Sequence, residues 1–242
     1  MTVLKIIQHL TLLGLIILLL SLSYWQWTRA HEKQLLLTQQ IQKKQADPVD
    51  ISNLQQLPLA QIRYQNIVAV GHYDTQHTVL IDNQISAGQA GYFVLTPFII
   101  NNSTQTILVN RGWVLMNPDR RHLPTLDKID EKTRRISGRI NYFPSVGIKL
   151  KGAEVPTNTE PTIVQVVNPE ILGEKLAQSL YPFQLELNQT EAYGFKREWT
   201  TTTVLSPEQH IAYAIQWLLL ALTLTLLFLW FNLKQHDSTT KK

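Results

Sequence analysis

Residues 211–233 read IAYAIQWLLLALTLTLLFLWFNL, a run of 23 residues without Asp, Glu, Lys or Arg. Residues 6–27 read IIQHLTLLGLIILLLSLSYWQW and form a second uncharged run of 22 residues. A helix of roughly 20 apolar residues crosses a hydrocarbon layer of about 30 Å. The two runs therefore predict two transmembrane α-helices, and no stretch between them is long and apolar enough to be a third.

Aromatic residues close both runs and support this prediction, because Tyr and Trp rings favour the headgroup level of a bilayer. They are Tyr24, Trp25 and Trp27 in the first run and Trp230 and Phe231 in the second. A cleaved signal peptide is the alternative for the first run. That run is longer than the usual apolar core of a signal peptide, and no A-x-A cleavage site follows it. We therefore expect an uncleaved anchor.

The excess positive charge of this 242-residue chain lies beside the two apolar runs and not in the segment between them. The net charge of +4 arises outside residues 30–209, which carry 17 basic and 17 acidic side chains. A neutral middle segment lacks the basic surface that binds phosphates, so we expect no nucleic-acid partner. The chain has no Cys, which excludes a disulfide scaffold, a Cys-ligated metal and a thiol nucleophile.

Two spans place both termini on one side of the lipid bilayer and the middle segment on the other. Lys234, Lys241 and Lys242 favour a cytoplasmic C-terminus by the positive-inside rule. No Arg- and Ser-rich presequence precedes Ile6, which favours a bacterial inner (plasma) membrane over a mitochondrial precursor. The expected segments are an anchor over 1–29, an extracytoplasmic (periplasmic) domain over 30–209, a transmembrane helix over 210–233 and a polar cytoplasmic tail over 234–242.

The middle segment predicts an α+β domain. The first helix should continue to Gln45 and stop before Asp47-Pro48. A short helix should begin with Asn168 as its cap and Pro169 in its first position. The short strands and tight turns predict an antiparallel sheet, either open or curled toward a barrel. Alternation of apolar residues predicts strands over 63–73, 78–82, 92–101, 105–116, 134–142, 163–167 and 183–188.

The chain carries none of the common catalytic motifs, such as G-x-S-x-G, a Walker loop or H-E-x-x-H, so we do not expect an enzyme. His72, Asp74, His77 and Asp82 lie close together in sequence around a predicted strand turn. They would hold a metal ion only if three or more of them converged. The alternative is that they are solvated loop residues beside a hairpin.

Arg111 stands in the predicted strand over 105–116, and alternation places it on one face with Ile107, Val109 and Trp113. A charged group on an apolar strand face needs a carboxylate or backbone carbonyls, because an unpaired buried charge is expensive. Two interpretations stay open. Arg111 forms a structural ion pair, or Arg111 and the neighbouring Trp113 contact a propionate or an acidic group of a partner.

The start of the second span is the most informative part of the sequence. Ser206 and Gln209 have the spacing of a capping box, and Pro207 suits the first helical position. His210 therefore lies in the first turn of the helix. Helical spacing places five residues on one face. They are His210, Tyr213, Ala214, Trp217 and Ala221.

This face suits a planar macrocycle, because the two alanines leave room beside His210 while Tyr213 and Trp217 offer flat apolar walls. The positive end of the helix dipole disfavours added charge, so we expect a neutral imidazole, which is the metal-binding form. Histidine is a common axial ligand of haem iron. The alternatives are a capping or interfacial histidine within an aromatic belt, or a helix-packing face built from small residues. His31 is a candidate for a second contact. His9 lies 18 residues before Trp27, which places it roughly 27 Å from Trp27 along the helix and on the other side of the membrane.

Taken together, these motifs resemble those of the Surfeit-locus protein 1 family of cytochrome c oxidase assembly factors. The resemblance covers almost the whole chain and is most specific in VNRGWV at 109–114 and HIAYAIQW at 210–217. Further matching pieces are YWQWTR at 24–29, GHYD at 71–74, LIDN at 80–83, GQAGYFVLTP at 88–97, YPF at 181–183 and REW at 197–199.

The resemblance implies a role in the maturation of haem–copper terminal oxidases rather than catalysis. It implies that His210 ligates the iron of haem a, which is then inserted into subunit I of cytochrome c oxidase, with Tyr213 and Trp217 lining the macrocycle. The implied partners are subunit I, other oxidase assembly or haem a synthesis factors, and the lipid bilayer. The alternative is a scaffold that stabilises an early oxidase subunit intermediate without binding haem.

Overall fold

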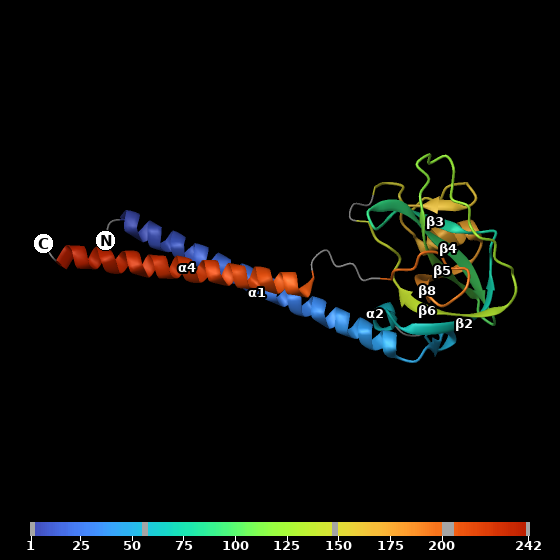
Figure 1. Ribbon diagram of the computed structural model, residues 1–242, viewed down its shortest axis with the longest axis horizontal. Coiled ribbons are helices and arrows are strands. Elements are labelled where there is room, and N and C mark those ends of the chain that lie inside the picture. Colours follow the sequence, from blue (N-terminus) through green and yellow to red (C-terminus); the bar gives the residue numbers. More distant parts are fainter. Residues whose placement is uncertain (1–2, 55–57, 147–149, 200–205, 241–242) are drawn as a thin grey trace. The chain divides into compact units, whose positions relative to one another are not determined.

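The computed structural model describes residues 3–54, 58–146, 150–199 and 206–240 (Figure 1). The chain forms two compact units. The first contains Met1–Gln40 and Thr201–Lys242, and we name it the helix pair. The second contains Ile41–Thr200, and we name it the barrel domain. The barrel domain begins later than residue 30 because the first helix continues well beyond Arg29.

The helix pair consists of α1 (Val3–Gln45) and α4 (Pro207–Thr240). Both helices are long and apolar enough to cross a membrane, over Ile6–Lys43 and Pro207–Leu233, as predicted. The end of α1 at Gln45 also agrees with the stop expected from Asp47-Pro48. The tail predicted over 234–242 is helical to Thr240, and Lys241 and Lys242 lie outside the described residues.

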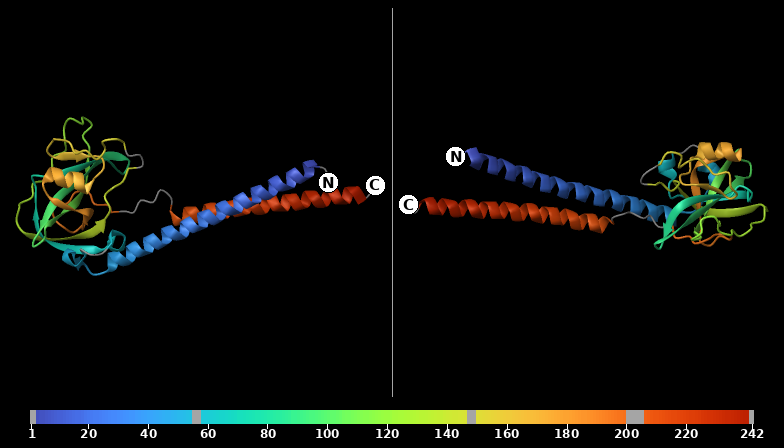
Figure 2. Two further views of the ribbon diagram at one scale, coloured as in Figure 1. Left: turned by 180° about the vertical axis from the view of Figure 1, so that it is seen from behind. Right: turned by 90° about the horizontal axis from the view of Figure 1, so that it is seen from above.

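The two helices run antiparallel, side by side (Figure 2). The Ser23 hydroxyl donates to the Ala214 carbonyl oxygen at 2.8 Å. At the other end, the rings of His9 and Phe228 meet edge to face with centroids 5.0 Å apart. Contacts between α1 and α4 therefore extend along the predicted spans.

The barrel domain has the α+β composition predicted from the sequence. Its strands are β1 (Val49–Asp50), β2 (Asn66–Tyr73), β3 (Val79–Ser86), β4 (Gln89–Ile100), β5 (Gln105–Leu115), β6 (Arg134–Asn141), β7 (Thr162–Val164) and β8 (Ser179–Leu187). Its short helices are η1 (Ile51–Leu54), α2 (Leu59–Ile62) and α3 (Pro169–Leu176). Asn168 caps α3 as predicted, since its side-chain oxygen accepts from the backbone N–H groups of Glu170 and Ile171.

The strands follow the order β1-β2-β6-β8-β5-β4-β3-β7, and β2 also pairs with β4. This pairing closes β2, β6, β8, β5 and β4 into a five-stranded barrel, so the sheet is curled rather than open. The barrel sheet is mainly antiparallel, as predicted, but β8 is parallel to β5, β7 to β3 and β1 to β2. The reason is connectivity: β8 follows α3 rather than a tight turn, and it enters between β5 and β6.

Two apolar clusters occupy the two faces of the barrel sheet. One contains Ile67, Phe98, Ile107 and Leu185, which come from four barrel strands. The other joins Leu172 and Leu176 of α3 to strand residues such as Val79, Leu95 and Leu108. Alternate residues of β5 therefore pack into different clusters, as the period-two pattern requires.

Candidate functional site

The start of α4 has the local structure that the capping box predicts. The backbone N–H of Gln209 donates to the Ser206 hydroxyl at 3.3 Å, and the backbone N–H of Ser206 donates to Gln209 Oε1 at 2.8 Å. Pro207 is the first helical residue. His210 therefore lies in the first turn of α4, as expected.

The imidazole of His210 is held against α1. Only 7% of His210 is exposed, and its Nδ1 lies 2.6 Å from Oε1 of Gln26. Because an amide oxygen only accepts, Nδ1 carries the proton of this hydrogen bond, and the lone pair of a neutral imidazole would then lie on Nε2. A histidine that ligates a metal typically has its other ring nitrogen bonded in this way.

Gln26 is a residue of the site that sequence reasoning missed. It is a polar residue between Trp25 and Trp27, inside a run without charged residues. An amide near a bilayer needs a hydrogen-bond partner, and that need was the available signal. Only the pairing of α1 with α4 identifies the partner as His210.

The face of α4 predicted to leave room for a macrocycle is only partly open. Ala214 and Ala221 are 3% and 2% exposed, and Ser23 of α1 donates to the carbonyl of Ala214. The room beside the alanines is therefore filled by α1, because small side chains let two helix backbones approach closely. Tyr213 is 43% exposed and Trp217 is partly exposed, so the two aromatic rings lie at the accessible border of this face.

The two histidines of α1, His9 and His31, form no hydrogen bond with His210 among the described residues. His9 contacts Phe228 at the far end of the helix pair, in agreement with the separation predicted along the helix. His31 is exposed, and no hydrogen bond to it is found among the described residues. The structure therefore brings Gln26, rather than His31, to His210.

Arg111 is buried in the barrel domain, with 2% of its surface exposed. Its Nε donates to the Tyr193 carbonyl at 2.8 Å, and its Nη1 lies 3.4 Å from the Thr96 hydroxyl. The guanidinium carbon is 4.8 Å from the centroid of the Phe195 ring. Among the described residues no carboxylate forms an ion pair with it, so its observed partners are neutral. Desolvation by burial lowers the pKa of Arg111 to about 10.

Trp113 does not share the environment of Arg111, because a β-bulge interrupts the alternation of β5. Phe93 pairs with Trp113 but Leu95 pairs with Asn110, which leaves one extra residue on β5. Gly112 supplies the bend with a φ of 117°. The indole N–H of Trp113 donates to the Gln84 carbonyl at 2.9 Å. Its polar atom is thus engaged within the domain, and the expected common face with Arg111 was wrong.

The residues around the β2–β3 turn do not assemble into a metal site. His77 Nδ1 lies 2.7 Å from Asp74 Oδ2, whereas Asp82 lies 3.9 Å from Arg120. Among the described residues no three His, Cys, Asp or Glu side chains are grouped so that they could hold a metal ion. Asp74 and His77 lie in the loop between β2 and β3, in agreement with the alternative of loop residues, whereas His72 and Asp82 belong to the strands themselves.

Comparisons with known proteins connect these features to a family. The model of the SURF1 family matches residues 13–222. The chain is 28% identical over 76 residues to the cytochrome oxidase assembly protein SHY1 of Saccharomyces cerevisiae, covering 30% of this chain and 20% of that protein. It is also 28% identical over 106 residues to a SURF1-like protein of Rickettsia bellii, covering 43% of this chain and 42% of that protein. The aligned stretches thus span less than half of either relative.

Proposed function

The chain belongs to the SURF1 family, and from this membership we propose that it is an assembly factor for a haem–copper cytochrome oxidase. The family match includes most of α1, the whole barrel domain and the first half of α4. The name of the yeast relative, a cytochrome oxidase assembly protein, supports the same role. In this proposal the chain acts by binding oxidase components, subunit I among them, and not by catalysis.

We further propose that His210 binds haem a as cargo before the haem reaches subunit I. The observation that carries this proposal is the hydrogen bond from His210 Nδ1 to Gln26, because it places the ligand lone pair of a neutral imidazole on Nε2. Tyr213 and Trp217 lie beside His210 at the accessible border of α4 and supply apolar ring surfaces. Iron ligation is the chemistry that haem contributes, and the chain supplies the ligand and the apolar surroundings.

Binding a macrocycle requires the side chains around Nε2 of His210 to move aside while the hydrogen bond to Gln26 is kept, because only 7% of His210 is exposed. In this proposal the buried His210 represents the closed, haem-free state of the site.

A second candidate function is a scaffold that stabilises an early oxidase subunit intermediate without haem. The packing of Ala214 and Ala221 against α1 favours it, because a tightly packed helix pair offers a rigid surface to another membrane protein. In this function His210 serves only to join the two helices.

Absorption spectroscopy of the full chain, co-expressed with haem a synthesis, separates the two candidates. We expect a Soret band in the wild-type protein and its loss in His210→Ala. His9→Ala is the matched control, because His9 belongs to the same helix pair but contacts Phe228 at its other end. A wild-type protein without a Soret band would contradict the haem proposal. A haem-free His210→Ala protein that still restores oxidase assembly would support the scaffold.

A further inference from the structure

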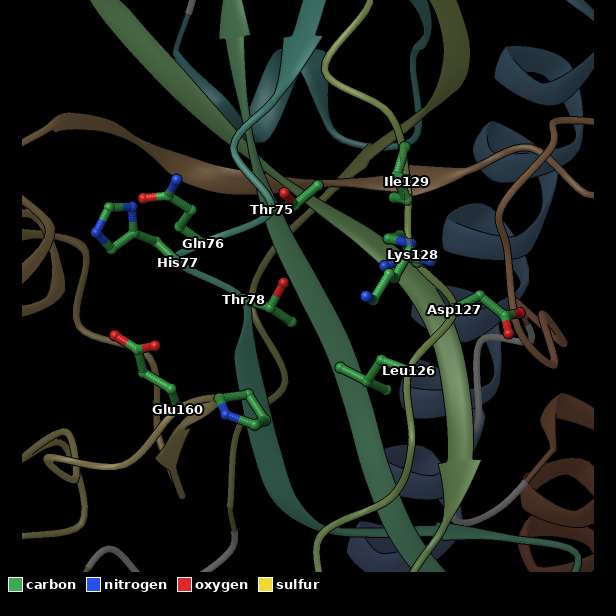
Figure 3. A pocket seen from close by; sticks show the side chains of 11 residues that line it. Thr75, Gln76, His77, Thr78, Leu126, Asp127, Lys128, Ile129 and Glu160 are labelled. Atoms are coloured by element: carbon green, nitrogen blue, oxygen red, sulfur yellow. The ribbon is translucent and has the colours of Figure 1, made fainter.

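The barrel domain contains a cavity of about 480 Å³ that the proposed function does not use (Figure 3). Its walls come from residues 75–78 after β2, residues 126–129 before β6 and residues 160–161 before β7. Arg111 of β5 completes the lining. In Figure 3, Thr78, Leu126 and Lys128 extend toward the same space, whereas the Asp127 carboxylate is turned away from it.

Arg111 is the buried charge of this cavity. The cavity lining contains three further charged residues, and all of them are exposed. They are Asp127, Lys128 and Glu160. Arg111 uses Nε and Nη1 for a carbonyl and a hydroxyl, while its buried Nη2 has no hydrogen-bond partner among the described residues. A buried cationic donor without an acceptor is costly, so its presence suggests a ligand that supplies the acceptor.

A second unpaired donor lies close to Arg111. The hydroxyl of Tyr73, two residues before the cavity wall, is also buried without a hydrogen-bond partner among the described residues. Burial raises the pKa of Tyr73 to about 12, while the nearby charges of Arg111 and Arg134 act in the opposite direction. The hydroxyl therefore stays protonated although three arginines, Arg111, Arg134 and Arg197, lower its pKa. The nearby Glu191 is engaged, since its Oε1 accepts from the backbone N–H and the hydroxyl of Ser137.

We propose that this cavity binds a monocarboxylate, with Nη2 of Arg111 as the principal donor at its inner end. Leu126, Ile129 and Pro161 offer apolar surface for the body of the ligand. A small organic acid or the carboxylate of a protein segment would supply the same group. A propionate, one of the contacts expected for Arg111 from its place in the strand, belongs to this class.

The test uses the full chain in lipid nanodiscs and two pairs of probes. The first pair is 3-phenylpropionate and its neutral amide, and the second is N-acetyl-Gly-Phe with a free or an amidated C-terminus. Calorimetric titration should show that a free carboxylate binds and that its amide does not. Binding of the small acid identifies a small-molecule source, and binding of the peptide acid alone identifies a protein segment.

Variants then locate the site. Arg111→Met should weaken carboxylate binding by about tenfold or more, and Arg111→Lys should retain part of it. Arg120→Met is the matched control, because it removes an exposed arginine outside this cavity and should bind like the wild type. If Arg111→Met fails to fold, the comparison of each acid with its amide on the wild-type chain still tests whether the chain binds a carboxylate. The proposal is overturned if acids and amides bind alike, if neither acid binds, or if a folded Arg111→Met binds unchanged.

Discussion

Nδ1 of His210 lies 2.6 Å from Oε1 of Gln26, and this hydrogen bond joins the first turn of α4 to α1. The two residues come from opposite ends of the sequence, and each belongs to a segment of the resemblance to the Surfeit-locus family. The bond determines which imidazole nitrogen is available to a ligand. It also closes one end of the helix pair, whose other end is marked by His9 and Phe228.

Gln26→Ala should lower the haem content of the purified protein about tenfold, because the imidazole loses the partner that orients it. The ratio of Soret to protein absorbance measures this effect. Gln34→Ala changes the same residue type at an exposed position of α1 and should leave the ratio unchanged. Equal haem content in the Gln26→Ala and wild-type proteins would argue against a positioning role for Gln26.

Ala214→Leu should destabilise the helix pair by about 1–3 kcal/mol, because the larger side chain overfills a buried helix contact. The loss of helical circular dichroism on heating in nanodiscs measures the change. Ala212→Leu is the control, since Ala212 is exposed on the same helix. If the two variants melt together, α4 does not pack on α1 through its small residues.

Glu186→Gln should destabilise the barrel domain by about 3 kcal/mol, because it leaves a buried arginine without its carboxylate. Glu186 Oε2 accepts from Nε of Arg139, and Oε1 accepts from Nδ2 of Asn141 at 2.8 Å. Chemical unfolding followed by tryptophan fluorescence provides the measurement. Glu198→Gln removes an exposed carboxylate and should change the unfolding free energy by less than about 0.5 kcal/mol. A similar small effect of Glu186→Gln would show that this ion pair contributes little.

Arg111→Met should change the unfolding free energy by less than about 1 kcal/mol, in contrast to Glu186→Gln. Removing Arg111 recovers the cost of burying an unpaired charge, and this gain offsets the lost hydrogen bond to the Tyr193 carbonyl. The same unfolding assay applies, without added carboxylates. A loss of about 3 kcal/mol or more would identify Arg111 as a structural residue of the barrel.

Lys132→Cys should react with a membrane-impermeant maleimide on spheroplasts if the barrel domain is extracytoplasmic. The Lys132 side chain is 84% exposed, and the chain has no cysteine of its own to create background. Labelling of intact and permeabilised spheroplasts is compared by gel mobility. Labelling that appears only after permeabilisation would place the barrel domain in the cytoplasm.

The sequence by itself determined the features that depend on near neighbours in the chain. Two uncharged runs identified α1 and α4, alternation located every strand except the two-residue β1, and the caps at Asn168 and Ser206 located the starts of α3 and α4. These features follow from hydrogen bonds and apolar periods within a few residues, which a single sequence displays directly.

The tertiary structure decided which faces and edges meet. It placed β8 parallel to β5, closed the barrel through β2 and β4, and filled the space beside Ala214 with α1. It also paired Gln26 with His210 and left Nη2 of Arg111 without an acceptor. Each of these outcomes depends on contacts between segments far apart in the chain. Local hydrogen bonds and periodicity are satisfied equally well by several such pairings, and only the packing of the whole domain selects one.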